Sequence, residues 1–186
     1  VPNPTPPRQP AEIKDLADYK RMVDEYDTGI RYADSKLGQL FDRLREQGIY
    51  EDTAIIISSD HGEALGEMGS YCEHGEADYA VTHIPLIIKW PGCARNAVSH
   101  GFHYNLDLLP TLIDLLGGVP PFTCNPVVGN TNPVTYYGES YADCVRTGAD
   151  GGRDWLVLSQ CAHVCQRSVR FEDYLYKRHS QQNTTH

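Results

Sequence analysis

The sequence lacks the features that mark membrane-spanning and nucleic-acid-binding proteins. It contains no run of about 18 apolar residues, so a membrane-spanning helix is not expected. Lys and Arg number 16 against 25 Asp and Glu, which gives a net charge of −9 at pH 7. No basic stripe is interleaved with aromatic residues, so nucleic-acid binding is not expected either. The proline-rich start, VPNPTPPRQP, also lacks the apolar segment of a signal peptide.

The composition is that of a chain that folds. Hydrophobic residues make up 40% and charged residues 22% of the 186 residues, which is ordinary for a globular protein and enough for one domain with a core. Residues 1–11 are predicted to form a Pro-rich extended linker. Such a start indicates a chain that begins partway through a larger one.

The six cysteines do not identify a site on their own. An even set of six allows 15 pairings. Cys161 and Cys165 are spaced C-x3-C around His163, but no second pair at a matching spacing completes a zinc site. Free thiols or one local disulfide are the preferred reading, and the redox compartment stays undecided. The full set is Cys72, Cys93, Cys124, Cys144, Cys161 and Cys165.

A long amphipathic helix is predicted over residues 13–44. Apolar residues recur there at steps of three and four, and Gly48 ends the pattern. Gly29 and Gly38 weaken the helix, so a kink or break is expected at one of them.

The next segments alternate between strands and helices. The β-branched run at residues 53–59 predicts a strand buried on both faces, as in a parallel sheet. A second strand is predicted at 84–90, and a helix at 108–116 that Gly117 and Gly118 stop. The order helix–strand–loop–strand–helix is an α/β pattern with at least one crossover.

The amino-acid composition changes after residue 118. Pro, Gly, Asn and Thr dominate residues 119–152, which predicts a long loop or a subdomain boundary. Three strand-like runs follow at 155–160, 168–171 and 174–177, as in the edge of a small antiparallel sheet.

Titratable residues gather directly after the first predicted strand. Asp60 and His61 stand at its carboxyl end, where α/β sheets bind ligands, and both side-chain types bind divalent metals. Taken alone, the pair is more often a capping Asp beside a surface His. Glu63, Glu67 and His74 add further ligand types in the same loop, which favours a metal or anion site.

These residues also carry a family resemblance. Residues 58–67 (SSDHGEALGE) resemble the second signature region of the sulfatases, in the alkaline-phosphatase-like superfamily. The block from His74 through 82–88 (THIPLII) to 90–92 (WPG) continues the match in order. Ordered blocks are far more specific than one motif.

Three further blocks extend the resemblance from about Tyr19 to Tyr176. Residues 26–53, which end in LREQGIYEDT, resemble the helix that leads to the first strand, and 107–112 is similar to the family's D-x-x-P-T helix. Residues 159–170 (SQCAHVCQRSVR) resemble the start of the C-terminal sheet. The expected fold is α/β: part of an alkaline-phosphatase-like mixed sheet flanked by helices, over 12–118. Part of a small C-terminal antiparallel subdomain with a long loop follows over 119–186.

The resemblance implies roles for individual residues. Asp60 and His61 match ligands of the catalytic divalent cation, for which the family favours calcium, although imidazole also suits manganese, zinc or iron. His74 falls where many sulfatases place a lysine that contacts the substrate sulfate, so it is the expected catalytic and substrate-binding residue. Sulfate-ester cleavage needs such cations because negative charge develops at the reacting centre. The family's members are mostly exported or lysosomal, so the resemblance implies an exported, periplasmic or lysosomal location.

The family's nucleophile motif, C/S-x-P-x-R, whose Cys or Ser becomes formylglycine, has no match. Cys124 and Pro126 match two positions of the motif, but Val128 occupies the position that requires Arg. The segment also follows Asp60 in the sequence, whereas the family's nucleophile precedes that residue. The paired N-terminal Asp ligands are also missing. The chain therefore resembles the C-terminal half of a sulfatase, inactive alone, with a sulfate ester as substrate and the missing N-terminal half as partner.

Other readings stay open. One is a phosphodiesterase or phosphonate monoester hydrolase of the same superfamily, where Asp-His-Gly also occurs. Another is a non-catalytic truncated paralogue, and a third is an α/β domain without a site, which leaves the ordered blocks unexplained.

Overall fold

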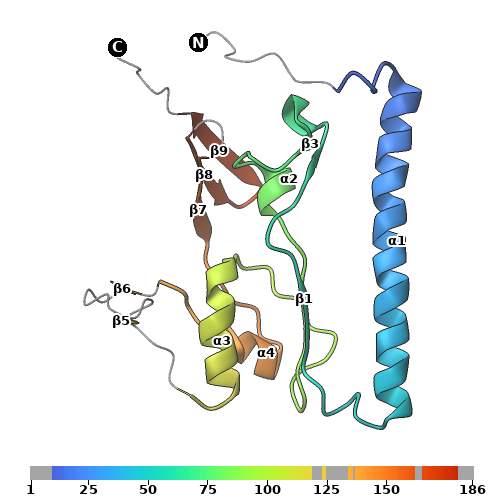
Figure 1. Ribbon diagram of the computed structural model, residues 1–186. Coiled ribbons are helices and arrows are strands. Elements are labelled where there is room, and N and C mark those ends of the chain that lie inside the picture. The colour runs from blue at the N-terminus through green and yellow to red at the C-terminus, as the bar shows by residue number, and fades with distance from the viewer. Residues whose placement is uncertain (1–9, 119–122, 125–133, 136, 162–164, 180–186) are drawn as a thin grey trace. The chain divides into compact units, whose positions relative to one another are not determined.

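A computed structural model describes residues 10–118, 123–124, 134–135, 137–161 and 165–179 (Figure 1). They belong to two compact units. The first unit comprises the described residues within Val1–Ile87, Leu158–Ser168 and Lys177–His186. The second comprises those within Ile88–Val157 and Val169–Tyr176. Within the described ranges, no helix has the length and apolar character needed to cross a membrane. The boundaries predicted at residues 11 and 118 stay predictions.

Helix α1 (Leu16–Glu46) confirms the predicted long helix. Its N-terminus is capped by the Asp15 carboxylate, which accepts hydrogen bonds from Ala17 N and Asp18 N at 2.8 and 3.0 Å. The break expected at Gly29 or Gly38 is wrong, because the helix is continuous over 31 residues. An isolated glycine costs a helix only about 0.5–1 kcal/mol, which a helix of this length tolerates. No residue of α1 is buried.

Strands β1 (Ile55–Ser58) and β4 (Leu86–Lys89) are hydrogen-bonded neighbours. Since other elements separate them in the sequence, the predicted crossover is confirmed. The expectation that β1 is buried on both faces is wrong: Ile55–Ile57 are only half-buried. On β4, Leu86 and Ile87 are 40% and 59% exposed. A sheet of two strands leaves its faces open, whatever its apolar content.

Four short elements lie between β1 and β4. They are β2 (Ala64–Leu65), the 3₁₀ turn η1 (Glu67–Gly69), β3 (Tyr71–Glu73) and the one-turn helix α2 (Tyr79–Thr82). Strands β2 and β3 pair antiparallel, with Ala64 opposite Glu73 and Leu65 opposite Tyr71. This small hairpin decides where the candidate site residues lie.

The second unit holds the other helices. The 3₁₀ turn η2 (Asn105–Asp107) leads into α3 (Leu108–Leu115), which confirms the helix predicted at 108–116. Helix α4 (Ala142–Thr147) lies in the segment predicted to be a loop, and Gly148 ends it in the left-handed region at φ 76°. The two-residue strands β5 (Thr123–Cys124) and β6 (Val134–Thr135) pair antiparallel. The rest of 119–136 lies outside the described residues.

The three strand-like runs near the end of the sequence form one sheet, in the order β7-β8-β9. Their bounds are Trp155–Gln160, Gln166–Phe171 and Tyr174–His179. Cys161 and Cys165 are not joined in a disulfide. His163, which lies between them, is outside the described residues.

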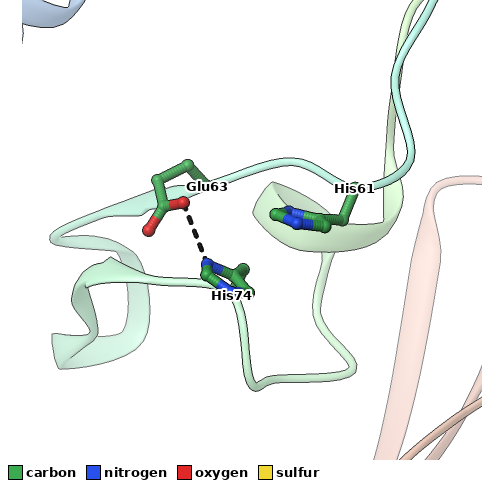
Figure 2. Close-up of side chains that lie close together, drawn as sticks. All are labelled: His61, Glu63 and His74. Atoms are coloured by element: carbon green, nitrogen blue, oxygen red, sulfur yellow. Dashed lines mark hydrogen bonds and ion pairs between the residues drawn. The ribbon is translucent and has the colours of Figure 1, made fainter.

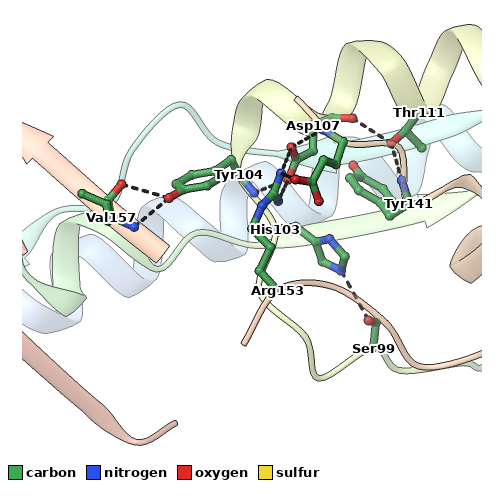
Figure 3. A network of polar contacts seen from close by, with 9 residues as sticks. Ser99, His103, Tyr104, Asp107, Thr111, Tyr141, Arg153 and Val157 are labelled. Carbon is green, nitrogen blue, oxygen red and sulfur yellow. Dashed lines mark hydrogen bonds and ion pairs between the residues drawn. The ribbon is translucent and has the colours of Figure 1, made fainter. Parts of the chain in front are cut away.

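A buried ion pair anchors the start of α3 (Figure 3). The Asp107 side chain is 0% exposed, and Arg153 binds both of its carboxylate oxygens. Backbone N–H groups of Tyr104 and Glu139 donate to the same carboxylate at 2.7 and 2.8 Å. Four hydrogen bonds thus satisfy the buried charge, as a buried charge requires.

The threonine of the D-x-x-P-T block continues this network. The Thr111 hydroxyl donates to the Asp107 backbone carbonyl at 2.7 Å and accepts from Tyr141 N at 3.0 Å. It therefore joins α3 to the residue that precedes α4. The Tyr141 ring lies beside His103, with ring centroids 4.6 Å apart. The D-x-x-P-T block therefore has a structural role in this unit.

Candidate metal centre

The turn after β1 is shaped by a close approach of two backbones. Gly62 N donates to Val81 O at 2.7 Å. A Cβ at position 62 would lie 2.1 Å from Ala80 O, which no side chain can occupy. Glycine is thus required here for space, and α2 fixes the turn that carries the residues on either side of Gly62.

The β2–β3 hairpin brings His74 back to this turn. Glu63 directly precedes β2 and His74 directly follows β3. Because Ala64 pairs with Glu73, the residues flanking that pair also meet. His74 Nδ1 lies 3.2 Å from Glu63 Oε2 as a result.

Three side chains converge at this point (Figure 2). The rings of His61 and His74 stack with centroids 4.2 Å apart at 19°. One ligand atom from each of His61, Glu63 and His74 lies within 4.8 Å of the other two. We call these three residues the His-Glu-His group. Their side chains are 43%, 24% and 57% exposed, respectively, so the group is open to solvent.

The predicted ligand Asp60 lies beside this group. Its Oδ2 is 3.8 Å from His61 Nε2, and its side chain is 87% exposed. Hydrogen bonds from its own backbone N–H and from that of His61 hold the pKa of the Asp60 carboxyl below its usual value. A carboxylate that stays ionised is ready to bind a cation.

The orientation of His61 leaves one ring nitrogen for a ligand. His61 Nδ1 lies 2.9 Å from Gly62 O. A carbonyl oxygen only accepts, so Nδ1 is the donor in this contact, and in the neutral form of the ring the lone pair is on Nε2. Backbone carbonyls commonly fix metal-binding histidines in this way.

All the predicted site residues therefore lie around one turn, and Glu63 joins them more closely than its place in the sequence suggested. Glu67, the other carboxylate noted in the loop, instead accepts a hydrogen bond from Leu65 N at 2.6 Å. His83 stacks on Tyr79, with centroids 4.6 Å apart. Two imidazoles and a carboxylate suit manganese, iron or zinc better than calcium, which prefers oxygen ligands.

Known proteins resemble this chain over much of its length. The sulfatase family model matches residues 1–119. The multifunctional alkaline phosphatase superfamily protein PehA of Trinickia caryophylli is 36% identical over 116 residues, which are 60% of this chain and 22% of that protein. A choline-sulfatase of Rhizobium meliloti (strain 1021) is 38% identical over 102 residues, covering 53% of this chain and 19% of that protein.

Solved structures share the fold. BT1596, a 2-O GAG sulfatase, aligns with a TM-score of 0.70 at 22% identity, over 91% of this chain and 36% of that one. The phosphonate monoester hydrolase SpPMH from Silicibacter pomeroyi aligns with a TM-score of 0.58 at 22% identity, over 82% and 33%. The chain thus has a partial alkaline-phosphatase-like α/β fold.

The chain spans about a fifth of the length of these two curated relatives. The match of the family model nevertheless covers well over half of the sequence, and it includes the turn after β1 and the His-Glu-His group. The chain therefore belongs to the sulfatase family.

Proposed function

We propose that this chain supplies part of the active site of a divalent-metal-dependent hydrolase that cleaves sulfate esters of carbohydrates or aryl alcohols. The convergence of His61, Glu63 and His74 beyond the end of β1 carries the proposal. In α/β folds, ligands bind beyond the carboxyl ends of strands. Membership of the sulfatase family gives the reaction class, hydrolysis of an ester.

The His-Glu-His group would hold the cation in this chain. His61 offers Nε2, and the ionised Asp60 is close enough to join as a further ligand. A bound cation would stabilise the negative charge that develops on the ester oxygens. His74 would have a second role, donating a hydrogen bond to a sulfate oxygen, as the family position that it matches suggests.

The remaining parts of the reaction need residues from elsewhere. No C/S-x-P-x-R motif occurs in the sequence, so the formylglycine nucleophile would come from another segment. Large apolar side chains of α1 are also exposed to solvent: Ile30 and Leu40 are 55% and 52% exposed. We infer that the complete enzyme has a further part that supplies the nucleophile and packs on such surfaces, and that the 186-residue chain alone is inactive.

Metal binding is tested on the purified chain by calorimetric titration with Mn²⁺, Zn²⁺ and Ca²⁺. We expect binding of Mn²⁺ or Zn²⁺ that weakens at least tenfold in His61→Ala and His74→Ala. His100→Ala removes an exposed histidine outside the group and is the matched control. Equal affinity in His61→Ala and the wild type would remove the basis of the proposed metal centre.

Substrate class is tested with two chromogenic esters, 4-nitrophenyl sulfate and 4-nitrophenyl phenylphosphonate. The complete enzyme is expected to cleave the sulfate ester faster. Faster cleavage of the phosphonate would favour the phosphonate monoester hydrolase reading, whose support is the shared fold with SpPMH. Metal-dependent turnover of either ester by the 186-residue chain alone would contradict the inference that its site is incomplete.

A further inference from the structure

A second polar cluster lies in the same unit as the His-Glu-His group and holds the chain that follows His74. The Lys177 ammonium, on β9, donates to Asp78 Oδ2 at 2.8 Å and to Glu76 Oε2 at 3.1 Å. One cation thus bridges two carboxylates about 100 residues away in the sequence.

Gln166, on β8, holds the residue between those two acids. Its Oε1 accepts a hydrogen bond from Ala77 N at 2.9 Å, and its Nε2 donates to Glu76 Oε2. Three consecutive residues, 76–78, are therefore fixed by two side chains of the C-terminal sheet.

The cluster is buried and charged. The side chains of Lys177 and Asp78 are 15% and 10% exposed, and Gln166 is 3% exposed. Burial by itself would lower the pKa of Lys177, but the hydrogen bonds to Asp78 and Glu76 outweigh it and raise the pKa, so the ammonium stays charged. Asp78 Oδ1 is buried and has no hydrogen-bond partner among the described residues. A buried charge tolerates little displacement from its partners, because separation leaves it uncompensated.

The segment held by this cluster is tied to both sides of the candidate metal centre. It begins two residues after His74, with only the buried Gly75 between. At its other end, Asp78 precedes α2, whose Val81 O accepts the hydrogen bond from Gly62 N. The turn that carries the other two members of the group therefore rests on the same segment.

We propose that Lys177 is a positioning residue for the His-Glu-His group, and that it fixes His74 against His61 through Glu76 and Asp78. The inference rests on the site proposed above, although its structural part can be measured without metal or substrate. It gives the C-terminal sheet a role in the site that no motif in the sequence indicates.

The experiment measures the nuclear Overhauser effect (NOE) between the ring protons of His61 and His74 in the metal-free 186-residue chain. We expect the NOE in the wild type, its loss in Lys177→Met, and its recovery in Lys177→Arg, which keeps the charge. Lys20→Met changes an exposed lysine of α1 and is the control. Mn²⁺ affinity is expected to fall roughly ten- to a hundredfold in Lys177→Met and to recover in Lys177→Arg.

Each outcome decides the proposal. An NOE that persists in Lys177→Met, or that is missing from the wild type, overturns it. If circular dichroism shows Lys177→Met to be unfolded, the double variant Glu76→Gln/Asp78→Asn takes its place, since it removes both carboxylates that Lys177 holds and keeps the size of their side chains. An unchanged NOE in that variant overturns the proposal as well. Loss of the NOE together with absent Mn²⁺ binding by the wild type supports positioning and contradicts only the proposed metal centre.

Discussion

Removing Arg153 is expected to destabilise the second unit strongly. The substitution Arg153→Met keeps most of the aliphatic length of the side chain but removes both hydrogen bonds to the Asp107 carboxylate. Asp107 is 0% exposed, so water cannot solvate its charge in place of the lost guanidinium. Among the described residues, the backbone donors of Tyr104 and Glu139 are the ones that the carboxylate keeps.

The size of the effect follows from this geometry. Breaking a buried ion pair by removing one partner costs about 3–5 kcal/mol. The two remaining backbone hydrogen bonds place the expected value near the lower limit, at about 3 kcal/mol. Since 1.4 kcal/mol corresponds to a factor of ten, the opening equilibrium constant of the unit should rise roughly a hundredfold or more.

Amide hydrogen exchange of α3 and α4 measures this change, because these amides exchange when the unit opens. Arg146→Met is the matched control: Arg146 also pairs with an aspartate, Asp114, but the two side chains are 39% and 35% exposed. Solvent screens such a pair, so its loss should barely change exchange. Similar acceleration in both variants would refute the argument that burial decides the cost.

Four further predictions concern single residues. Gly62→Ala should lower the thermal midpoint and weaken Mn²⁺ binding at least tenfold, because its Cβ would lie 2.1 Å from a backbone carbonyl oxygen. Gly38→Ala, with nothing within 4 Å of its Cβ, should instead stabilise the chain by about 0.5–1 kcal/mol in denaturant titrations. Burial and a neighbouring carboxylate raise the pKa of Tyr141 to about 12. Its contribution to stability is therefore complete below the usual value of 10.0 and is lost as the pH rises to about 12, and Tyr141→Phe should remove a late-ionising phenol from an absorbance titration. Burial lowers the pKa of His103 below 6.5, so its ring signals in NMR should titrate at lower pH than in the unfolded chain. Its contribution is present above that value and is lost as the pH falls through the lowered pKa, and a ring titrating above 6.5 would contradict the burial argument.

Local patterns in the sequence predicted the elements that local forces determine. The apolar periodicity of α1 and the Asp107–Thr111 block both act within a few residues, and both helices formed as expected. Helix α4 has six residues, too few for a periodic signal.

Properties that depend on distant residues were not predictable in the same way. The burial of β1 depends on what covers its faces, and its isoleucines are only half-buried. The contact between Glu63 and His74 depends on a short hairpin with two residue pairs. Its turn includes Met68 at φ 52°, a conformation that a methionine in the sequence does not predict. No sequence pattern predicted the cluster around Lys177, because the carboxylates that pair with Lys177 lie about 100 residues away in the sequence.

That separation between Lys177 and its acidic partners also sets an order of events during synthesis. A ribosome adds about 5–20 residues per second, so Lys177 joins the nascent chain roughly 5–20 s after His74. Until then residues 76–78 lack the ammonium that holds them, and the histidines that precede them remain without their final support. The site would mature only after β9 has been synthesised, and a molecule truncated before β9 would carry every residue of the His-Glu-His group without the contacts that keep them together.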